Sequence, residues 1–190
     1  MTQNITQENI DWINKNDYIS WPLDTLINHI EEKHHRYIEQ AIPVLQQYLD
    51  KICRVHGANH GELFEIAELF NASAIDLINH MKKEELKLFP YIRDIVMADN
   101  NGSNIKKPGF WSAINPIQVM LQEHENERKR YDKIAKLCNN YNAPEDACNS
   151  YKKTFSLLQE FENDLNHHID LENNILFPRA VELESRLLNQ

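Results

Sequence analysis

Apolar residues recur every three or four positions over four long stretches of the chain, and short polar segments separate these stretches. A helix has 3.6 residues per turn, so this spacing places the apolar side chains on one face of each helix. No stretch shows the sustained period-two alternation that a half-buried strand requires. The pattern predicts four amphipathic helices, at about 22–54, 61–98, 111–141 and 144–187.

The apolar faces of these helices are expected to form the core. Their residues share the helical spacing and are Leu26, Ile30, Ile38, Ile42, Leu45 and Leu49; Ile66, Phe70, Leu77, Leu88 and Tyr91; Ile117, Leu121, Tyr131 and Cys138; and Phe161, Leu165 and Ile175.

Glycine and proline separate the predicted helices at Gly57, Gly102 and Pro144. Four long helices with short connections describe an all-α fold, the antiparallel four-helix bundle. A coiled coil is the rival interpretation, but it requires longer unbroken heptads. We expect the bundle to occupy residues 21–190, after an N-terminal arm at 1–20 with weak periodicity.

Composition narrows the classes of protein. The 190 residues suit one domain, and 4 glycines supply too few loops for a dinucleotide-binding or all-β fold. The net charge of -9 argues against a nucleic-acid partner. Neither a signal peptide nor an apolar run of about 18 residues occurs, so we expect a cytoplasmic protein away from the membrane. The 3 cysteines match no metal-binding spacing and are expected to be free thiols.

One motif occurs twice: a histidine, a glutamate four residues later, and Leu-Phe-Pro after three more residues. The copies begin at His80-x-x-x-Glu84 and His168-x-x-x-Glu172. Residues four apart on a helix project from the same face, and both pairs fall on the apolar stripes. Buried carboxylates must be paired, neutralised or metal-bound. A surface His–Glu hydrogen bond would explain one pair, but the repetition favours a metal site.

Two prolines follow these motifs. Pro90 and Pro178 each lie six residues after the glutamate. A proline inside a helix removes one backbone hydrogen bond, so each residue either kinks its helix or ends it.

The other helices offer further histidine ligands. His124 lies on the apolar stripe of the third helix. On the first helix the spacing does not choose between His34, which continues Ile30 and Ile38, and His35. Imidazole and carboxylate ligands in a bundle suit iron or manganese. Histidine precedes glutamate by four residues here, which differs from the Glu-x-x-His order of ferritin-like sites.

These motifs together resemble those of a known family. The residues that carry the resemblance are His80-x-x-x-Glu84 with Leu88-Phe89-Pro90, Glu123-His124, His168-x-x-x-Glu172-Asn173-Asn174 with Leu176-Phe177-Pro178, Pro22-Leu23, His29, His35, Pro43 and Arg54-Val55-His56. They are similar to the hemerythrin-like domain, and most closely to its branch in the bacterial iron–sulfur cluster repair di-iron proteins. The resemblance covers about 20–187, nearly the whole chain.

The resemblance implies a four-helix bundle around two non-haem iron ions with oxo and carboxylate bridges. It implies that Glu84 and Glu172 bridge the irons, and that the terminal ligands are His35, His80, His124 and His168. His56 is a secondary candidate ligand. Glu123 is expected to contact one of the metal ligands without binding the metal itself.

Two departures from the family pattern limit what the resemblance implies. Oxygen-carrying hemerythrins have a second histidine four residues after the ligand of the third helix, where this chain has Arg128. The repair proteins usually begin with a small domain carrying a cysteine pair, which this sequence does not contain.

The resulting functional expectation is the repair of iron–sulfur clusters damaged by oxidative or nitrosative stress, through iron donation or handling of nitric oxide. The expected partners are damaged iron–sulfur proteins or a scaffold protein, together with nitric oxide or oxygen as diatomic ligands. The alternatives are an oxygen or nitric oxide binding or sensing protein, and a metal-free helical interaction module.

Overall fold

The fold was analysed in a computed structural model, which describes residues 17–105, 109 and 112–189. Most of the predicted arm, residues 1–16, therefore lies outside the described residues. Its last residues form a short 3₁₀ helix, Tyr18–Ser20, and the Tyr18 side chain is buried against the bundle.

Four helical columns make up the described chain. The first comprises α2 (Leu23–His29), a π-helical turn η2 (Ile30–His35) and α3 (Arg36–His56). The second comprises α4 (Glu62–Lys83), the π-turn η3 (Glu84–Leu88) and α5 (Phe89–Asn101). The third is α6 (Ile114–Leu137), and the fourth comprises α7 (Asn149–Leu171), the π-turn η4 (Glu172–Leu176) and α8 (Phe177–Leu188).

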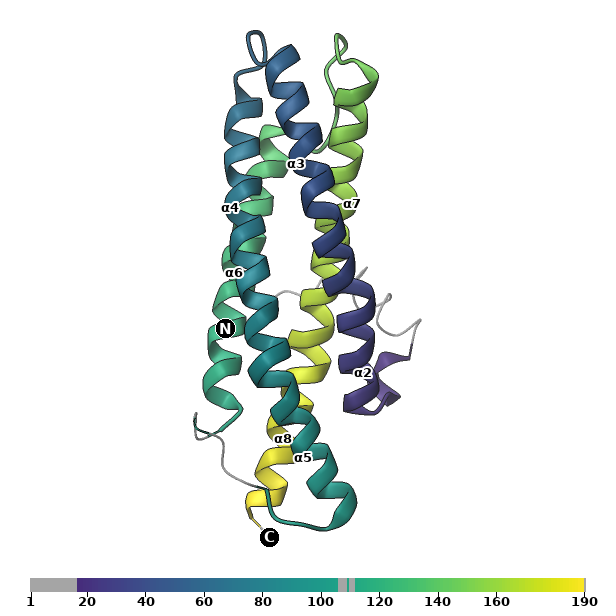
Figure 1. The fold of residues 1–190 in the computed structure, drawn as a ribbon, viewed down its shortest axis with the longest axis vertical. Coiled ribbons are helices and arrows are strands. Elements are labelled where there is room, and N and C mark those ends of the chain that lie inside the picture. Colours follow the sequence, from purple (N-terminus) through teal and green to yellow (C-terminus); the bar gives the residue numbers. More distant parts are fainter. Residues whose placement is uncertain (1–16, 106–108, 110–111, 190) are drawn as a thin grey trace.

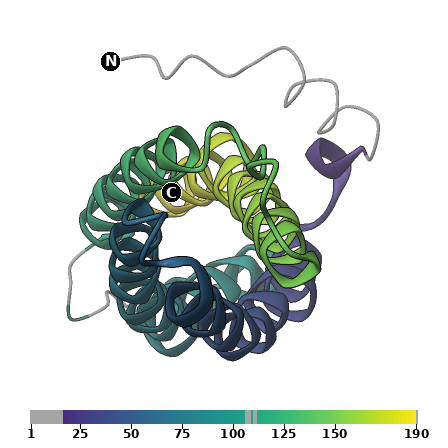
Figure 2. The same cartoon turned by 90° about the horizontal axis from the view of Figure 1, so that it is seen from above.

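The columns form the antiparallel bundle that the periodicity predicts. Helix α3 packs against α4 and α7, α6 packs against α4 and α7, and at the other end α5 packs against α2 and α8. Figure 1 shows the α3–α4 and α6–α7 connections together at one end, and Figure 2 shows the columns as a ring seen along the bundle. The described residues contain helices and no strand, which confirms the all-α fold. None of these helices combines the length and apolar character required to cross a membrane.

Three π-turns interrupt the columns. In each turn a backbone N–H bonds the carbonyl five residues earlier, as Phe89 does with Glu84 and Phe177 with Glu172. Pro90 and Pro178 follow directly, in the first turns of α5 and α8. A proline ring clashes with the carbonyl four residues before it, and the wider π-turn relieves this conflict without ending the column. The prolines therefore lie within continuous columns.

The loop between α6 and α7 is longer than the sequence predicts. Helix α6 ends at Leu137 rather than 141, because Asn139, Asn140 and Tyr141 adopt left-handed φ angles of 49°, 52° and 61°. Helix α7 begins at Asn149 rather than 144, after Cys148 in an extended conformation. Left-handed residues cannot continue a right-handed helix, and asparagine adopts this conformation more readily than most residues.

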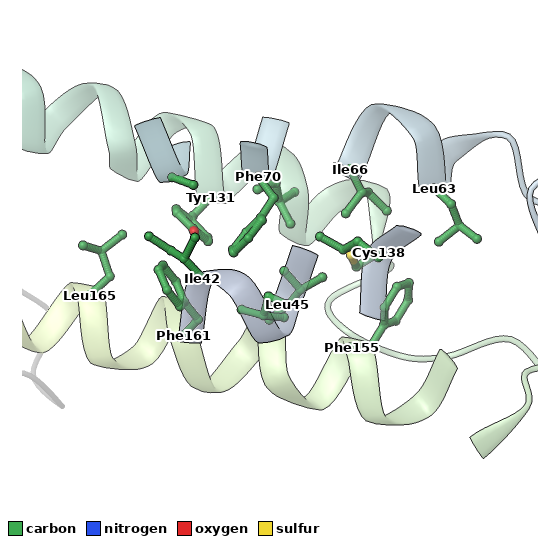
Figure 3. Packing of buried hydrophobic residues seen from close by; sticks show 14 of the residues in the cluster. Ile42, Leu45, Leu63, Ile66, Phe70, Tyr131, Cys138, Phe155, Phe161 and Leu165 are labelled. Carbon is green, nitrogen blue, oxygen red and sulfur yellow. The ribbon is translucent and has the colours of Figure 1, made fainter. Parts of the chain in front are cut away.

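Two apolar clusters fill the bundle and leave a zone between them. One lies among α3, α4, α6 and α7, where Phe161 contacts Phe70 and Tyr131 (Figure 3). The other joins α2, α5, α8 and the start of α6. All the predicted core residues are buried except Leu121, which is half-buried. In the first column Ile38 belongs to one cluster and Ile30 to the other, so the buried residues between them, His34 and His35, lie at the level where the clusters meet.

Candidate metal centre

All four columns contribute polar side chains to the zone between the two apolar clusters. These side chains are buried, with at most 3% of any residue exposed, and they belong to His35, His80, Glu84, His124, His168 and Glu172. The π-turns hold His35, Glu84 and Glu172, so the irregular backbone of the bundle coincides with the polar zone.

The six residues form two overlapping groups. The ligand atoms of His35, His168 and the two glutamates lie within 4.8 Å of one another, and so do those of His80, His124 and the same glutamates. Both glutamates belong to both groups. This arrangement offers two adjacent positions for cations, each with two imidazoles and access to two shared carboxylates.

Each carboxylate oxygen faces a different imidazole. Glu84 Oε1 lies 3.3 Å from His80 Nε2, and its Oε2 lies 3.4 Å from His35 Nε2. Glu172 Oε1 lies 3.1 Å from His168 Nε2, and its Oε2 lies 3.2 Å from His124 Nε2. Within the described residues none of these four oxygens has a hydrogen bond of good geometry. Because a buried carboxylate without hydrogen bonds is costly, the donor set fits cation binding, and imidazole with carboxylate suits iron.

Three of the imidazoles have a partner at Nδ1, the ring nitrogen that faces away from the glutamates. Nδ1 of His35 lies 2.7 Å from Glu85 Oε1, and Nδ1 of His80 lies 2.8 Å from Glu123 Oε2. Nδ1 of His124 lies 2.8 Å from Asn173 Oδ1. Partners of this kind fix the tautomer and orientation of a metal-binding histidine.

The sequence assigned no supporting role to two of these residues, Glu85 and Asn173, although Asn173 belongs to the motif that carries the resemblance. The structure places the predicted supporting residue Glu123 beside His80. Glu85 and Asn173 each directly follow the glutamate of a repeated motif, so the repeat itself carried the signal.

The electrostatics keep the carboxylates ionised. Burial and the neighbouring Glu172 act to raise the pKa of Glu84, but the imidazoles of His80 and His35 outweigh both and leave it lowered. Burial also opposes ionisation of Glu172, yet His168 and His124 hold its pKa well below the usual value. Burial lowers the pKa of His80, but Glu84 and Glu123 overcome that effect and raise it to about 10. The carboxylates are therefore ionised, as metal ligands must be, and a cation that binds here displaces the proton from His80.

The structure distinguishes the two histidines that spacing left open. His35 faces the glutamates, whereas His34 Nδ1 pairs with Asp164 at 3.0 Å. The His34 ring stacks on that of His168, with centroids 5.7 Å apart and planes at 9°. Both histidines are buried, and both lie in the π-turn η2. A π-turn bonds residues five apart instead of four, so it shifts the direction in which the following side chains point.

The structure does not bring His56, the secondary candidate ligand, into the cluster. His56 lies at the C-terminal end of α3, where its Nε2 is 3.2 Å from Cys148 Sγ. The 21 residues that separate it from His35 correspond to about 30 Å of helical rise.

Arg128 forms an ion pair beside the centre. Its Nη2 lies 2.6 Å from Oδ1 of Asp170, a buried residue between His168 and Glu172 in the sequence. The position one turn after His124 is therefore held by a paired guanidinium, which cannot bind a metal ion.

A four-helix bundle whose interior gathers histidine and glutamate from every column defines a class of helical metal-binding protein. The chain belongs to the hemerythrin family: the family described as "Hemerythrin HHE cation binding domain" matches residues 26–180. Membership implies non-haem iron binding.

Curated relatives agree with this assignment. The chain is 34% identical over 173 residues to "Iron-sulfur cluster repair protein DnrN" of Neisseria gonorrhoeae, covering 87% of this chain and 98% of that protein. It is 34% identical over 168 residues to "Iron-sulfur cluster repair protein YtfE" of Yersinia pestis and 33% identical to a "Probable iron-sulfur cluster repair protein" of Haemophilus influenzae. Each of these two matches covers 88% of this chain and 70% of the relative.

Proposed function

We propose that this chain is a cytoplasmic non-haem di-iron protein that helps to repair iron–sulfur clusters damaged by oxidative or nitrosative stress. The observation that carries the proposal is that Glu84 and Glu172 are shared by two His₂Glu₂ groups in one buried zone. Shared carboxylates support two cations rather than one. The names of the relatives support the role in repair.

The residues have distinct roles in this proposal. His35 and His168 would hold one iron, His80 and His124 would hold the other, and both glutamates would be available to either iron. The bound pair supplies releasable iron and open coordination for a diatomic ligand such as nitric oxide. The partners are damaged iron–sulfur proteins or a scaffold protein that receives the iron.

The chain's own carboxylates are shared by the two iron positions. Each glutamate presents its two oxygens to two different imidazoles, so each would contribute to holding either iron. Because Glu85, Glu123 and Asn173 hold three of the rings from outside, the imidazoles stay oriented for a replacement iron.

Iron analysis after anaerobic reconstitution tests the centre. We expect two irons per chain and the absorption of a di-iron centre; fewer than about one would refute it. The double variant Glu84→Leu/Glu172→Leu should lose both irons, since it removes every shared ligand. Glu127→Leu is the matched control, because Glu127 is buried but outside both groups. Circular dichroism verifies that each variant is folded.

Reactivation of a nitric-oxide-damaged iron–sulfur enzyme tests the function separately. The iron-loaded protein should restore activity, and the iron-free double variant should not. In stopped-flow spectroscopy with oxygen and nitric oxide, a stable reversible oxygen adduct without reactivation would indicate an oxygen-binding protein instead.

A further inference from the structure

A second group of reactive side chains lies at the end of the bundle where α3 meets α4 and α6 meets α7 (Figure 1). His56 ends α3, and Cys148 directly precedes α7. His56 Nε2 lies 3.2 Å from Cys148 Sγ, although 92 residues separate them in the chain. A thiol within hydrogen-bond reach of an imidazole is the arrangement of an activated cysteine.

The start of α7 also stabilises a thiolate at Cys148. The backbone N–H of Tyr151 and then the ring of His56 lower the pKa of Cys148 from 9.0 to about 7. These groups face a sulfur atom at the positive end of a helix of 23 residues. The thiol is exposed, so a reagent in solution can reach it.

The other two cysteines differ from Cys148 both in exposure and in the direction of their pKa shift. Cys53 and Cys138 are buried, and burial raises the pKa of each, to about 12 for Cys138. Both are poor nucleophiles, and burial shields them from reagents in solution. Among the three cysteines, Cys148 is therefore the thiol that a disulfide in solution can reach.

The group is better suited to thiol chemistry than to binding a cation. His60 lies nearby, with its ring centroid 6.3 Å from that of His56, but its nitrogens face Asp146 and Glu62. Among the described residues, this end of the bundle forms no group of three converging ligand atoms.

We propose that Cys148 and His56 form a reactive thiolate–imidazole pair that exchanges with low-molecular-weight disulfides to give a mixed disulfide on Cys148. The Cys148 thiolate attacks one sulfur of the disulfide, a new S–S bond forms, and the original S–S bond breaks. The second sulfur leaves as a thiolate with the bonding electron pair. His56 Nε2 holds the proton that the thiol releases and delivers it to the departing thiolate. The reaction is independent of the metal centre and of the proposed repair function.

Glutathione disulfide is the probe for the test, with the full chain followed by intact-mass spectrometry from pH 5.5 to 9. We expect one glutathione per folded chain, located on Cys148 by peptide mapping and absent from Cys148→Ser. The rate should rise with pH around a midpoint near 7. At pH 6 it should exceed the rate for an ordinary thiol with a pKa of about 8.5 roughly six-fold, because a roughly 30-fold larger thiolate fraction outweighs an approximately five-fold weaker nucleophile.

The variant His56→Gln separates the pair from the helix terminus. Its midpoint should rise by about one pH unit, and its rate at pH 6 should fall about three-fold. His60→Gln is the matched control, since His60 lies at the same end without touching the sulfur, and its profile should match the unsubstituted chain. An unchanged midpoint in His56→Gln, or glutathione on Cys53 or Cys138 of the folded chain, would overturn the proposal. Repeating the measurement with Glu84→Leu/Glu172→Leu should give the same profile, which distinguishes this chemistry from that of the metal centre.

Discussion

Replacing Glu123 by glutamine tests whether outer partners hold the candidate iron ligands. Glu123 Oε2 lies 2.8 Å from His80 Nδ1, and Glu123 also pairs with Lys83. Glutamine keeps the size of the side chain but removes the charge that orients and polarises the imidazole. It also leaves the Lys83 ammonium without its carboxylate partner, next to a site that would hold iron cations.

Loss of such a partner typically weakens metal binding 10- to 100-fold, or about 1.4–2.7 kcal/mol. His80 belongs to only one of the two ligand groups. The variant Glu123→Gln should therefore lose one iron at a chelator concentration that leaves the other bound. The mirror variant Glu85→Gln should weaken the group that contains His35, because Glu85 supports that ring.

Competition with a chromophoric chelator, followed by absorption and by iron analysis at each step, measures this difference. Glu125→Gln is the matched control, because Glu125 lies on the same helix, is partly exposed, and pairs with Lys129 at 3.1 Å. We expect two separated release steps in Glu123→Gln and an unchanged curve in the control. If Glu123→Gln released its iron like the control, the outer carboxylate would not support the centre.

Two further variants test the ion pair beside the centre and the packing of the core. Arg128→Met leaves Asp170 buried and unpaired and should cost about 3 kcal/mol of unfolding free energy in urea titrations, at the lower end of the usual range because the guanidinium is 24% exposed. Lys129→Met should change it by less than about 0.5 kcal/mol, and equal effects of the two variants would contradict the role of the pair. Phe161→Ala, in the fully buried centre of the core, should cost about 3–5 kcal/mol by the same measurement. Phe64→Ala, at an exposed phenylalanine, is its control, and a similar loss there would argue against the packing described.

The periodicity of the chain determined most of the fold. Each predicted core stripe is buried almost completely, because a helix presents every third or fourth residue on the same face regardless of its neighbours. The same rule showed that His80 and Glu84, like His168 and Glu172, project to the interior together. Local sequence also marked the breaks, since glycine and proline act on the backbone directly.

The assembly of side chains from different columns was decided by the tertiary structure. Periodicity could not choose between His34 and His35, because a π-turn changes which face a residue presents and the regular spacing contains no sign of it. The resemblance implied His35, and the structure places His35 beside Glu84 and His34 beside Asp164.

Contacts between residues of different helices also depend on the tertiary structure. His56 matched a family pattern, but its place along α3 carries it to the far end of the bundle, beside Cys148. Sequence patterns describe which face of its own helix a residue occupies. Only the axial alignment of four helices, set by core packing and by the π-turns, determines which residues of different helices meet. That alignment brings two glutamates and four histidines into one buried zone.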